Sequence, residues 1–96
     1  IMPFTLKFRS AARRDLKNLP KNIQEYILLT HIPTIAADPH GVGSPLRGSL
    51  RGERFYHFGS NPQYQIIYII EDEQIIVTTL GTRENIYKRA KRRRRR

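Results

Sequence analysis

Residues 64–80 read YQIIYIIEDEQIIVTTL, and this stretch decides the fold. It holds two apolar runs, 64–70 and 74–80, which are separated by an acidic turn over 71–73. Runs rich in β-branched and aromatic residues with a short turn between them predict a β-hairpin. The first run is apolar on both faces apart from Gln65, so we expect a central strand that is covered on both sides.

Upstream and downstream of this hairpin the pattern predicts the remaining elements. Residues 4–8 alternate between apolar and polar, which indicates a first strand. Two helices are expected over 11–19 and 22–32, because apolar residues recur there at helical spacing and prolines separate and end them. A further strand is expected over 54–58, after a loop rich in Gly, Pro and Ser. Residues 82–87 are expected to form a loop or a short helical turn.

The order β-α-α-β-β-β predicts an α+β fold, in which two N-terminal helices pack on one face of an antiparallel sheet. The core should lie between the helices and that face. We expect it to contain Leu16, Leu19, Ile23, Ile27, Ile67, Ile69 and Val77. The opposite face of the sheet is then the expected working surface.

Length and composition limit the class of protein. The 96 residues suit a single domain, and the absence of cysteine excludes disulfides and thiolate metal sites. No apolar run approaches the roughly 18 residues that span a bilayer, and the N-terminus does not resemble a signal peptide. We therefore expect a protein of the reducing cytoplasm that does not bind membranes.

The net charge of +10 is concentrated at the C-terminus. Residues 88–96 contain eight of the 18 Lys and Arg residues and no acid, whereas residues 1–87 are nearly neutral. We therefore divide the chain into one domain over 1–87 and a basic tail over 88–96. Such a run attracts polyphosphate through counterion release, but a solvated and partly disordered end explains it equally well.

A few side chains are suited to RNA cleavage. Without a metal, attack of a 2′-hydroxyl on the neighbouring phosphate needs a base, an acid and a cation for the developing charge. His57, in the strand over 54–58, can act as an acid or a base near neutral pH. Arg83 and Tyr87 are four residues apart, so a helical turn would project both to the same side. The arginine guanidinium can hold a phosphate, and the tyrosine can stack on a nucleobase or donate a proton.

Each of these residues also has a simpler explanation. His57 alone is explained as well by an exposed strand histidine, Arg83 by an ion pair with a neighbouring carboxylate, and Tyr87 by anchoring of the tail on the core. His31 and His40 have no partners at metal-ligand spacing and are expected to be structural. We therefore expect no metal and no cofactor.

Taken together, the segments resemble the RelE/ParE superfamily of bacterial toxins. The resemblance is carried by FRSAARRDLKNLPKNIQ at 8–24, ADPHGVGSPLRGSLRGERFYHF at 37–58 and YQIIYIIEDEQIIVTTLGTRENIY at 64–87. It implies a RelE-like fold of the kind expected above and a toxin of a type II toxin–antitoxin system. Catalytic members of the superfamily are ribosome-dependent mRNA interferases, which enter the ribosomal A site and cut the messenger by 2′-hydroxyl attack.

Within the superfamily, the sequence resembles the YafQ-like branch. It shares the pattern PL-x-G-S-x-basic-G, here residues 45–52, and a terminal GT-x4-aromatic pattern, here residues 81–87. The resemblance implies a catalytic set of His57 for proton transfer, Arg83 for stabilising the phosphate and Tyr87 for orienting the nucleotide. The position of Arg83 is histidine in that branch and arginine in RelE proper.

The sequence departs from the family at two positions and adds basic residues elsewhere. Gln63 stands where an acidic residue would fall and cannot titrate, and Gln65 stands where RelE proper carries an arginine. The residues that we expect to bind RNA are Arg47, Arg51, Arg54, Gln63, Gln65, Lys88, Arg89 and Lys91. The implied partners are a cognate antitoxin and messenger RNA on the ribosome, with contacts to 16S ribosomal RNA, but no membrane and no small-molecule cofactor.

Two other functions stay open at this point. A ParE-like toxin that inhibits DNA gyrase by protein contact would keep the fold without a catalytic set. A non-catalytic basic RNA-binding module would need little more than the basic tail. The trio of His57, Arg83 and Tyr87 favours the nuclease.

Overall fold

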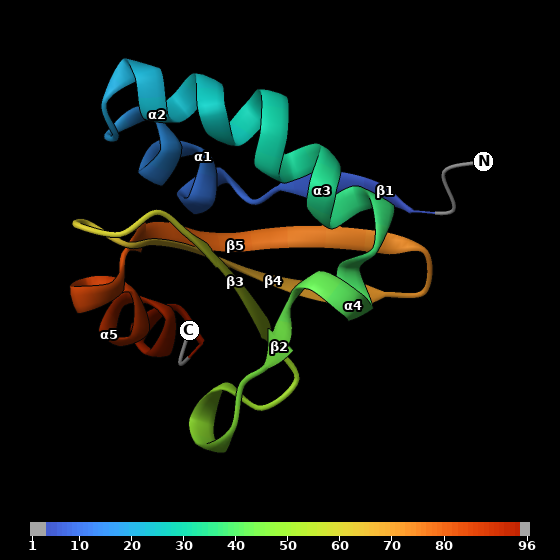
Figure 1. Cartoon of the computed structure of the whole chain (residues 1–96). Helices are drawn as coiled ribbons and strands as arrows, with labels where there is room; N and C mark the ends of the chain where they lie inside the picture. Colours follow the sequence, from blue (N-terminus) through green and yellow to red (C-terminus); the bar gives the residue numbers. More distant parts are fainter. Residues whose placement is uncertain (1–3, 95–96) are drawn as a thin grey trace.

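The computed structural model describes residues 4–94, which form one five-stranded sheet with helices on both faces (Figure 1). The α+β prediction is therefore confirmed. The strands are β1 (Thr5–Phe8), β2 (Ser44–Pro45), β3 (Arg54–Phe58), β4 (Tyr64–Glu71) and β5 (Gln74–Thr82). They are hydrogen-bonded in the order β1-β5-β4-β3-β2.

The helices precede, interrupt and follow the strands. They are α1 (Ser10–Lys17), α2 (Lys21–Tyr26), the π-helix η1 (Ile27–His31), α3 (Ile32–Ala37), α4 (Pro39–Val42), the 3-10 helix η2 (Gly48–Leu50) and α5 (Arg83–Arg94). In Figure 1, α1 to α3 lie on one side of the sheet and α5 lies on the other. No helix in the described part of the chain is long and apolar enough to cross a membrane.

The predicted hairpin forms the centre of the sheet. β4 pairs antiparallel with β5 and with β3. However, β1 pairs parallel with β5, so the sheet is mixed and the expectation of a purely antiparallel sheet is wrong for this pair. The cause is the connection that follows β1: the chain crosses one face as helices and enters the sheet at the far edge with β2. The antiparallel meander then brings β5 back beside β1 in the same direction.

The second helical stretch runs from Lys21 to Ala37 and changes its hydrogen bonding just before Pro33. The sequence predicted that this proline would kink or end the helix, because it has no N–H and its ring crowds the preceding turn. The helical stretch does not end there: the π-helix η1 comes just before the proline, and Pro33 lies in the first turn of α3. The wider π turn accommodates the proline, so the helical stretch continues.

The main core lies between the N-terminal helices and the sheet. Its buried members are Ala12, Leu16, Ile27, Ile35, Phe58, Ile66, Tyr68, Ile75, Val77 and Leu80. Leu19 and Ile23 pack against it and are partly buried. The prediction for Ile67 and Ile69 is wrong, because Ile67 packs in a second cluster and Ile69 lines a hollow on the other face. Alternate residues of a strand point to opposite faces, and Ile66 and Tyr68 take the helix side.

The second sheet face is covered by α5 and is not left free (Figure 1). Ile86 and Ala90 of this helix pack with Leu50 and Ile67 in a second buried cluster. This covering corrects the expectation that the face opposite α1 would be exposed as a whole. The working surface must instead lie beside α5.

The helix α5 also differs from the sequence-based expectation for the end of the chain. The sequence predicts a loop or short helical turn over residues 82–87 and a separate basic tail over residues 88–96. The structure has one helix from Arg83 to Arg94 that crosses the expected boundary. Residues 95–96 of the expected tail lie outside the described part of the chain.

Two buried carboxylates hold α5 against the sheet. Asp15 on α1 accepts hydrogen bonds from both terminal nitrogens of Arg93, at 2.7 Å and 2.8 Å, and lies 3.4 Å from a nitrogen of Arg89. Glu53, just before β3, accepts a hydrogen bond from Arg94 at 2.9 Å. These contacts explain how a helix with so few apolar residues is fixed in place.

Candidate functional site

A hollow open to solvent lies where α5 leaves β5, and we call it the His57 hollow. Its volume is about 280 Å³. Its lining residues come from β3, β4, the turn between these strands and the first two turns of α5. They are Phe55, His57, Gln63, Gln65, Arg83 and Tyr87. The hollow therefore brings together the three predicted catalytic residues and the two glutamines.

Strand geometry fixes the β3 and β4 walls of the hollow. Phe55 and His57 are two residues apart, so both side chains point to the α5 side of the sheet, whereas Tyr56 points to the helix side. His57 lies directly opposite Gln65 in the register between β3 and β4. Backbone pairing thus places the imidazole beside the Gln65 amide.

The first turns of α5 supply the third wall. Arg83 and Tyr87 are four residues apart on this helix, so they project to the same side, as the spacing predicted. The backbone N–H of Arg83 donates to the carbonyl oxygen of Gln63 at 3.0 Å. This hydrogen bond ties the beginning of α5 to the turn before β4.

A chain of hydrogen bonds crosses the floor of the hollow. The Tyr87 hydroxyl donates to Oε1 of Gln65 at 2.5 Å, and Nε2 of Gln65 donates to Oε1 of Gln63 at 3.1 Å. Gln65 is 4% exposed, so its amide is a buried polar group that these two contacts satisfy. The chain fixes the orientation of the tyrosine ring and of both amides.

Two of the side chains that line the hollow face solvent. His57 and Arg83 are both exposed. Arg83 takes part in none of the ion pairs among residues 4–94, so the simpler explanation of an ion pair with Glu84 is not supported. The guanidinium is therefore available to a bound anion.

Sequence reasoning missed Phe55. Its ring is partly buried, and its centroid lies 6.1 Å from that of the His57 ring at an interplanar angle of 24°. Together with Tyr87 it gives the hollow an aromatic wall. Strand alternation could have identified Phe55, because it stands two residues before His57 in a predicted strand and therefore lies on the same face of the sheet as His57.

Two of the arginines expected to bind RNA are engaged in internal contacts. The Arg54 guanidinium donates to the carbonyl oxygens of His40 and Gly43, both at 2.8 Å. Arg89 donates to the carbonyl oxygen of Leu80 at 2.7 Å. The structure does not bring either guanidinium to the His57 hollow.

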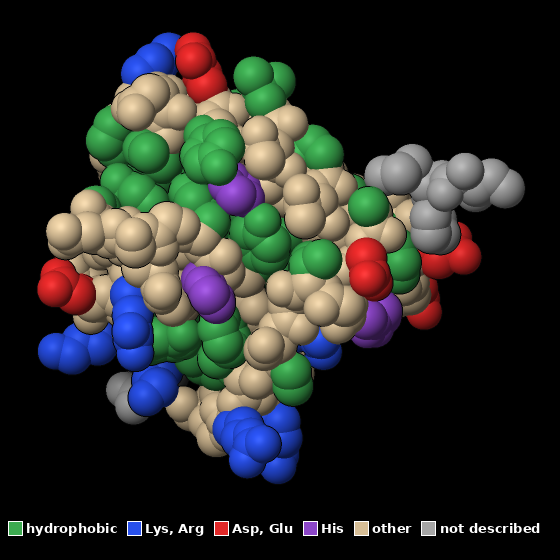
Figure 2. Space-filling view, viewed as in Figure 1, with side chains coloured by type: hydrophobic (Ala, Val, Ile, Leu, Met, Phe, Trp, Pro, Cys, Tyr) green, Lys and Arg blue, Asp and Glu red, His purple; other side chains and the backbone are tan. Residues whose placement is uncertain are grey.

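The other expected RNA-binding cations lie on the surface. Lys88 and Lys91 are exposed on α5, and Arg47 and Arg51 are exposed in the segment between β2 and β3. Figure 2 shows Lys and Arg side chains over both of these elements, with an uncharged surface between them. A polyanion that crosses the hollow would thus meet positive charge on two sides.

The histidines outside the hollow have structural surroundings. His31 is buried on the helix side, where its Nδ1 lies 2.6 Å from the Tyr56 hydroxyl and its ring stacks on Phe58. Burial lowers the pKa of the His31 imidazole and raises the pKa of the Tyr56 hydroxyl. His40 is exposed on α4, away from the hollow. Within residues 4–94 there is no group of three or more His, Asp or Glu residues that could hold a metal ion.

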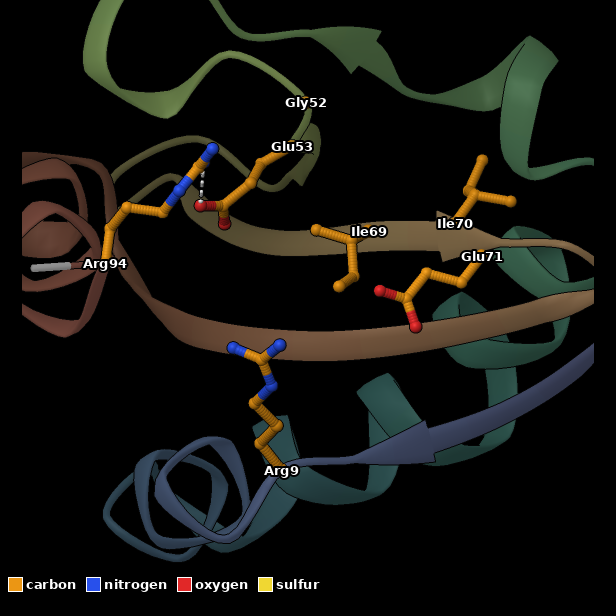
Figure 3. A pocket seen from close by; sticks show the side chains of 7 residues that line it. All are labelled: Arg9, Gly52, Glu53, Ile69, Ile70, Glu71 and Arg94. Carbon is orange, nitrogen blue, oxygen red and sulfur yellow. Dashed lines mark hydrogen bonds and ion pairs between the residues drawn. The ribbon is translucent and has the colours of Figure 1, made fainter. Parts of the chain in front are cut away.

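A second hollow on the α5 side lies beyond the end of that helix (Figure 3), and we call it the Arg9 hollow. It is lined by Arg9, Gly52, Glu53, Ile69, Ile70, Glu71 and Arg94. Figure 3 shows Arg94 pointing toward Glu53 at one side of it, and the two form an ion pair of 2.9 Å. The Arg9 hollow holds two arginines, two carboxylates and no imidazole, and the ion pair between Arg94 and Glu53 fixes the end of α5.

The sequence of this chain is similar to those of bacterial toxins. A family model described as the ParE-like toxin of type II bacterial toxin–antitoxin systems matches residues 6–91. Toxin RelG of Mycobacterium tuberculosis is 33% identical over 90 residues, which cover 92% of this chain and 100% of that protein. Toxin RelE of the same organism is 30% identical over 70 residues, which cover 73% of this chain and 69% of that protein.

The structure of this chain is also similar to solved structures. A chain of the toxin–antitoxin complex RelBE2 from M. tuberculosis superposes with a TM-score of 0.76 at 29% identity, over 84% of this chain and 99% of that chain. A mutant of E. coli toxin RelE in the free state superposes with a TM-score of 0.73 at 20% identity, over 94% of this chain and 96% of that chain. At that identity the second likeness concerns the fold alone.

Proposed function

This chain belongs to the family of ParE-like toxins of type II bacterial toxin–antitoxin systems, and from that premise we propose that it is an endoribonuclease that cuts messenger RNA on the ribosome. The observation that carries the proposal is the convergence of His57, Arg83 and Tyr87 on one solvent-open hollow. The imidazole can accept the 2′-hydroxyl proton, and the guanidinium, which makes no ion pair among residues 4–94, can stabilise the phosphate. The aromatic ring can hold a nucleobase by stacking.

The proposed reaction is an internal transfer at phosphorus. The 2′-oxygen of one nucleotide bonds to the adjacent phosphorus, and the bond from phosphorus to the 5′-oxygen of the next nucleotide breaks. The products are a 2′,3′-cyclic phosphate and a free 5′-hydroxyl. The 2′-hydroxyl proton passes to His57, which is exposed in the hollow, and the departing 5′-oxygen receives a proton from solvent that enters the open site.

Arg83 is proposed to stabilise the charge that develops on the phosphate. Its guanidinium presents a planar set of N–H donors, and no carboxylate of the described chain holds it. Its backbone is fixed by the hydrogen bond to Gln63. A donor that is placed before the reaction acts on the transition state without a cost of reorganisation.

Tyr87 is proposed to hold a nucleobase by stacking, with Phe55 as the second aromatic surface. The hydroxyl hydrogen of Tyr87 is already donated to Gln65 at 2.5 Å, which favours the role of the ring over that of a proton donor. Stacking on an aromatic ring is how proteins commonly hold unpaired RNA bases. The chain of amides through Gln65 and Gln63 then serves to keep the ring in place.

The exposed cations around the hollow are proposed to bind the RNA backbone. Lys88 and Lys91 on α5 and Arg47 and Arg51 before β3 are exposed on two elements that flank it. Phosphate contacts of this kind supply affinity without sequence preference and depend strongly on salt. The nucleotides on the ribosome, both messenger and ribosomal, are the proposed source of these phosphates.

We further propose that a cognate antitoxin binds this chain. The support is that the RelBE2 structure, which resembles it at 29% identity, is a toxin–antitoxin complex. An acidic antitoxin would complement a chain with a net charge of +10. Co-purification of the two proteins from one operon would test this pairing.

The test of the nuclease is translation on purified ribosomes programmed with one defined messenger. We expect cuts that map inside A-site codons, with 5′-hydroxyl and 2′,3′-cyclic phosphate ends. A parallel assay measures supercoiling by purified DNA gyrase, which we expect to be unaffected. Intact messenger with arrested supercoiling would transfer the assignment to gyrase inhibition, and intact messenger with normal supercoiling would leave the proposed nuclease refuted.

A further inference from the structure

A third hollow, which we call the Asn61 hollow, adjoins the His57 hollow. It has a volume of about 440 Å³ and is lined by Asn61, Pro62, Gln63, Thr82, Arg83 and Glu84. Gln63 and Arg83 line both hollows. The backbone hydrogen bond between these two residues therefore lies in a wall that the hollows share.

We propose that the Asn61 hollow holds the base of a nucleotide next to the scissile phosphate, and that Glu84 makes it select a base with an exocyclic amino group and disfavour uracil. This inference rests on the proposed function, because Arg83 is the proposed phosphate contact. A nucleotide chain that places its phosphate on Arg83 must continue on one side of that residue. The Asn61 hollow is a candidate for that side, because Arg83 lines both it and the His57 hollow.

The lining of the two hollows differs in chemistry. The His57 hollow offers the aromatic rings of Phe55 and Tyr87, which stack on any base. The Asn61 hollow shares Gln63 and Arg83 with the His57 hollow and adds an amide, a hydroxyl and a carboxylate, from Asn61, Thr82 and Glu84. Groups of this kind recognise the Watson–Crick edge of an unpaired base by hydrogen bonding.

The Glu84 carboxylate determines which Watson–Crick edge the Asn61 hollow binds. Glu84 is exposed and takes part in none of the ion pairs among residues 4–94, so its oxygens are free to accept hydrogen bonds. An ionised carboxylate has no donor. Adenine, cytosine and guanine each present an exocyclic amino group, whereas uracil presents one N–H between two carbonyl oxygens that a carboxylate repels.

The experiment compares base preference between the wild type and Glu84→Gln, which keeps the shape of the side chain and adds a donor. Ribosomes are programmed with messengers in which the nucleotide on either side of the cut is each of the four bases in turn. We expect the wild type to cut about tenfold more slowly when uracil stands at one of these two positions. In Glu84→Gln that difference should shrink to about twofold, and Glu73→Gln, an exposed acid in the turn between β4 and β5, should keep the wild-type preference.

An unchanged preference in Glu84→Gln, or a wild type indifferent to uracil at both positions, would overturn the inference while leaving the nuclease intact. A second measurement does not depend on cleavage. AMP, CMP, GMP and UMP are titrated separately into isotopically labelled protein, and the side-chain amide resonance of Asn61 is followed by NMR. We expect the three amino-bearing nucleotides to shift it more than UMP does, and equal shifts or none would overturn the inference even if the chain cuts no RNA.

Discussion

Replacing Asp15 with asparagine should destabilise the whole protein, because this carboxylate joins three separate elements. It is 7% exposed on α1. It accepts the backbone N–H of Leu80 in β5 at 3.0 Å and both terminal nitrogens of Arg93 in α5. Asparagine keeps the shape but removes the charge, and its amide group would point N–H donors at a guanidinium that has no acceptor for them.

The size of the effect follows from burial. Breaking a buried ion pair by removing one partner costs about 3–5 kcal/mol. The Arg93 side chain is 28% exposed and can be partly resolvated, so we expect about 2–3 kcal/mol for this pair. In a domain of this size a destabilisation of that order lowers the melting temperature by roughly 10–20 °C.

The assay is thermal and urea unfolding followed by circular dichroism. The matched control is Asp72→Asn, in the exposed turn between β4 and β5, where the backbone φ of +57° suits asparagine. Arg93→Gln and the double variant complete a cycle, for which we expect a coupling energy of about 1–3 kcal/mol. A melting temperature for Asp15→Asn within roughly 2 °C of that for Asp72→Asn would refute the reasoning.

Three further predictions concern the ring of Tyr87, the charge of α5 and the buried histidine. Tyr87→Phe should keep cleavage within about threefold of wild type while costing about 1 kcal/mol of stability, since it removes only the hydrogen bond to Gln65; an inactive but folded variant would show that the hydroxyl reacts. Replacing both Lys88 and Lys91 with glutamine should flatten the plot of log binding constant against log salt concentration, by about 0.7 in slope for each phosphate that is no longer neutralised. The melting temperature should not change. An unchanged slope would show that neither lysine belongs to the RNA-binding surface. Burial lowers the pKa of the His31 imidazole in the folded chain, so on acidification the unfolded chain takes up this proton at a higher pH than the folded chain does, and the free energy of unfolding should fall as the pH drops below about 6.5. Melts at pH 7.5 and 5.5 test this. The pH effect should persist in His40→Gln but vanish when His31 is replaced.

The sheet could be predicted because its information is local. The apolar runs of β4 and β5 and the turn between them are contiguous in the sequence. The pattern did not say which face each isoleucine takes, because both faces of β4 are apolar, and so Ile67 and Ile69 were assigned to the wrong side. The parallel pairing of β1 depends on the path of the whole chain and leaves no local signal.

The helix α5 could not be predicted from its own residues. Its apolar contacts come from Ile86 and Ala90, and the rest of it is mostly of one charge. The carboxylates that hold it, Asp15 and Glu53, are distant in the sequence. By contrast, the spacing of Arg83 and Tyr87 was enough to predict that they face the same way, because four residues are about one helical turn.

The internal roles of Arg54 and Arg89 were also beyond the sequence. Both donate to backbone carbonyl oxygens, and every residue offers such an acceptor, so no pattern distinguishes these arginines from exposed ones. Phe55 was within reach, since strand alternation places it beside His57.

The central claim is that Arg83 and His57 act on one scissile phosphate, and single-turnover cleavage of ribosome-bound messenger tests it most directly. Arg83→Ala should slow the reaction by about 10²–10³, which is the effect of removing one preorganised donor from a transition state. His57→Gln should slow it as well, because it removes the proposed proton acceptor. The controls are Arg13→Ala on the exposed side of α1 and His40→Gln on α4, both of which should cut at the wild-type rate. If Arg83→Ala and His57→Gln are folded and cut as fast as these controls, the reaction does not take place in this hollow.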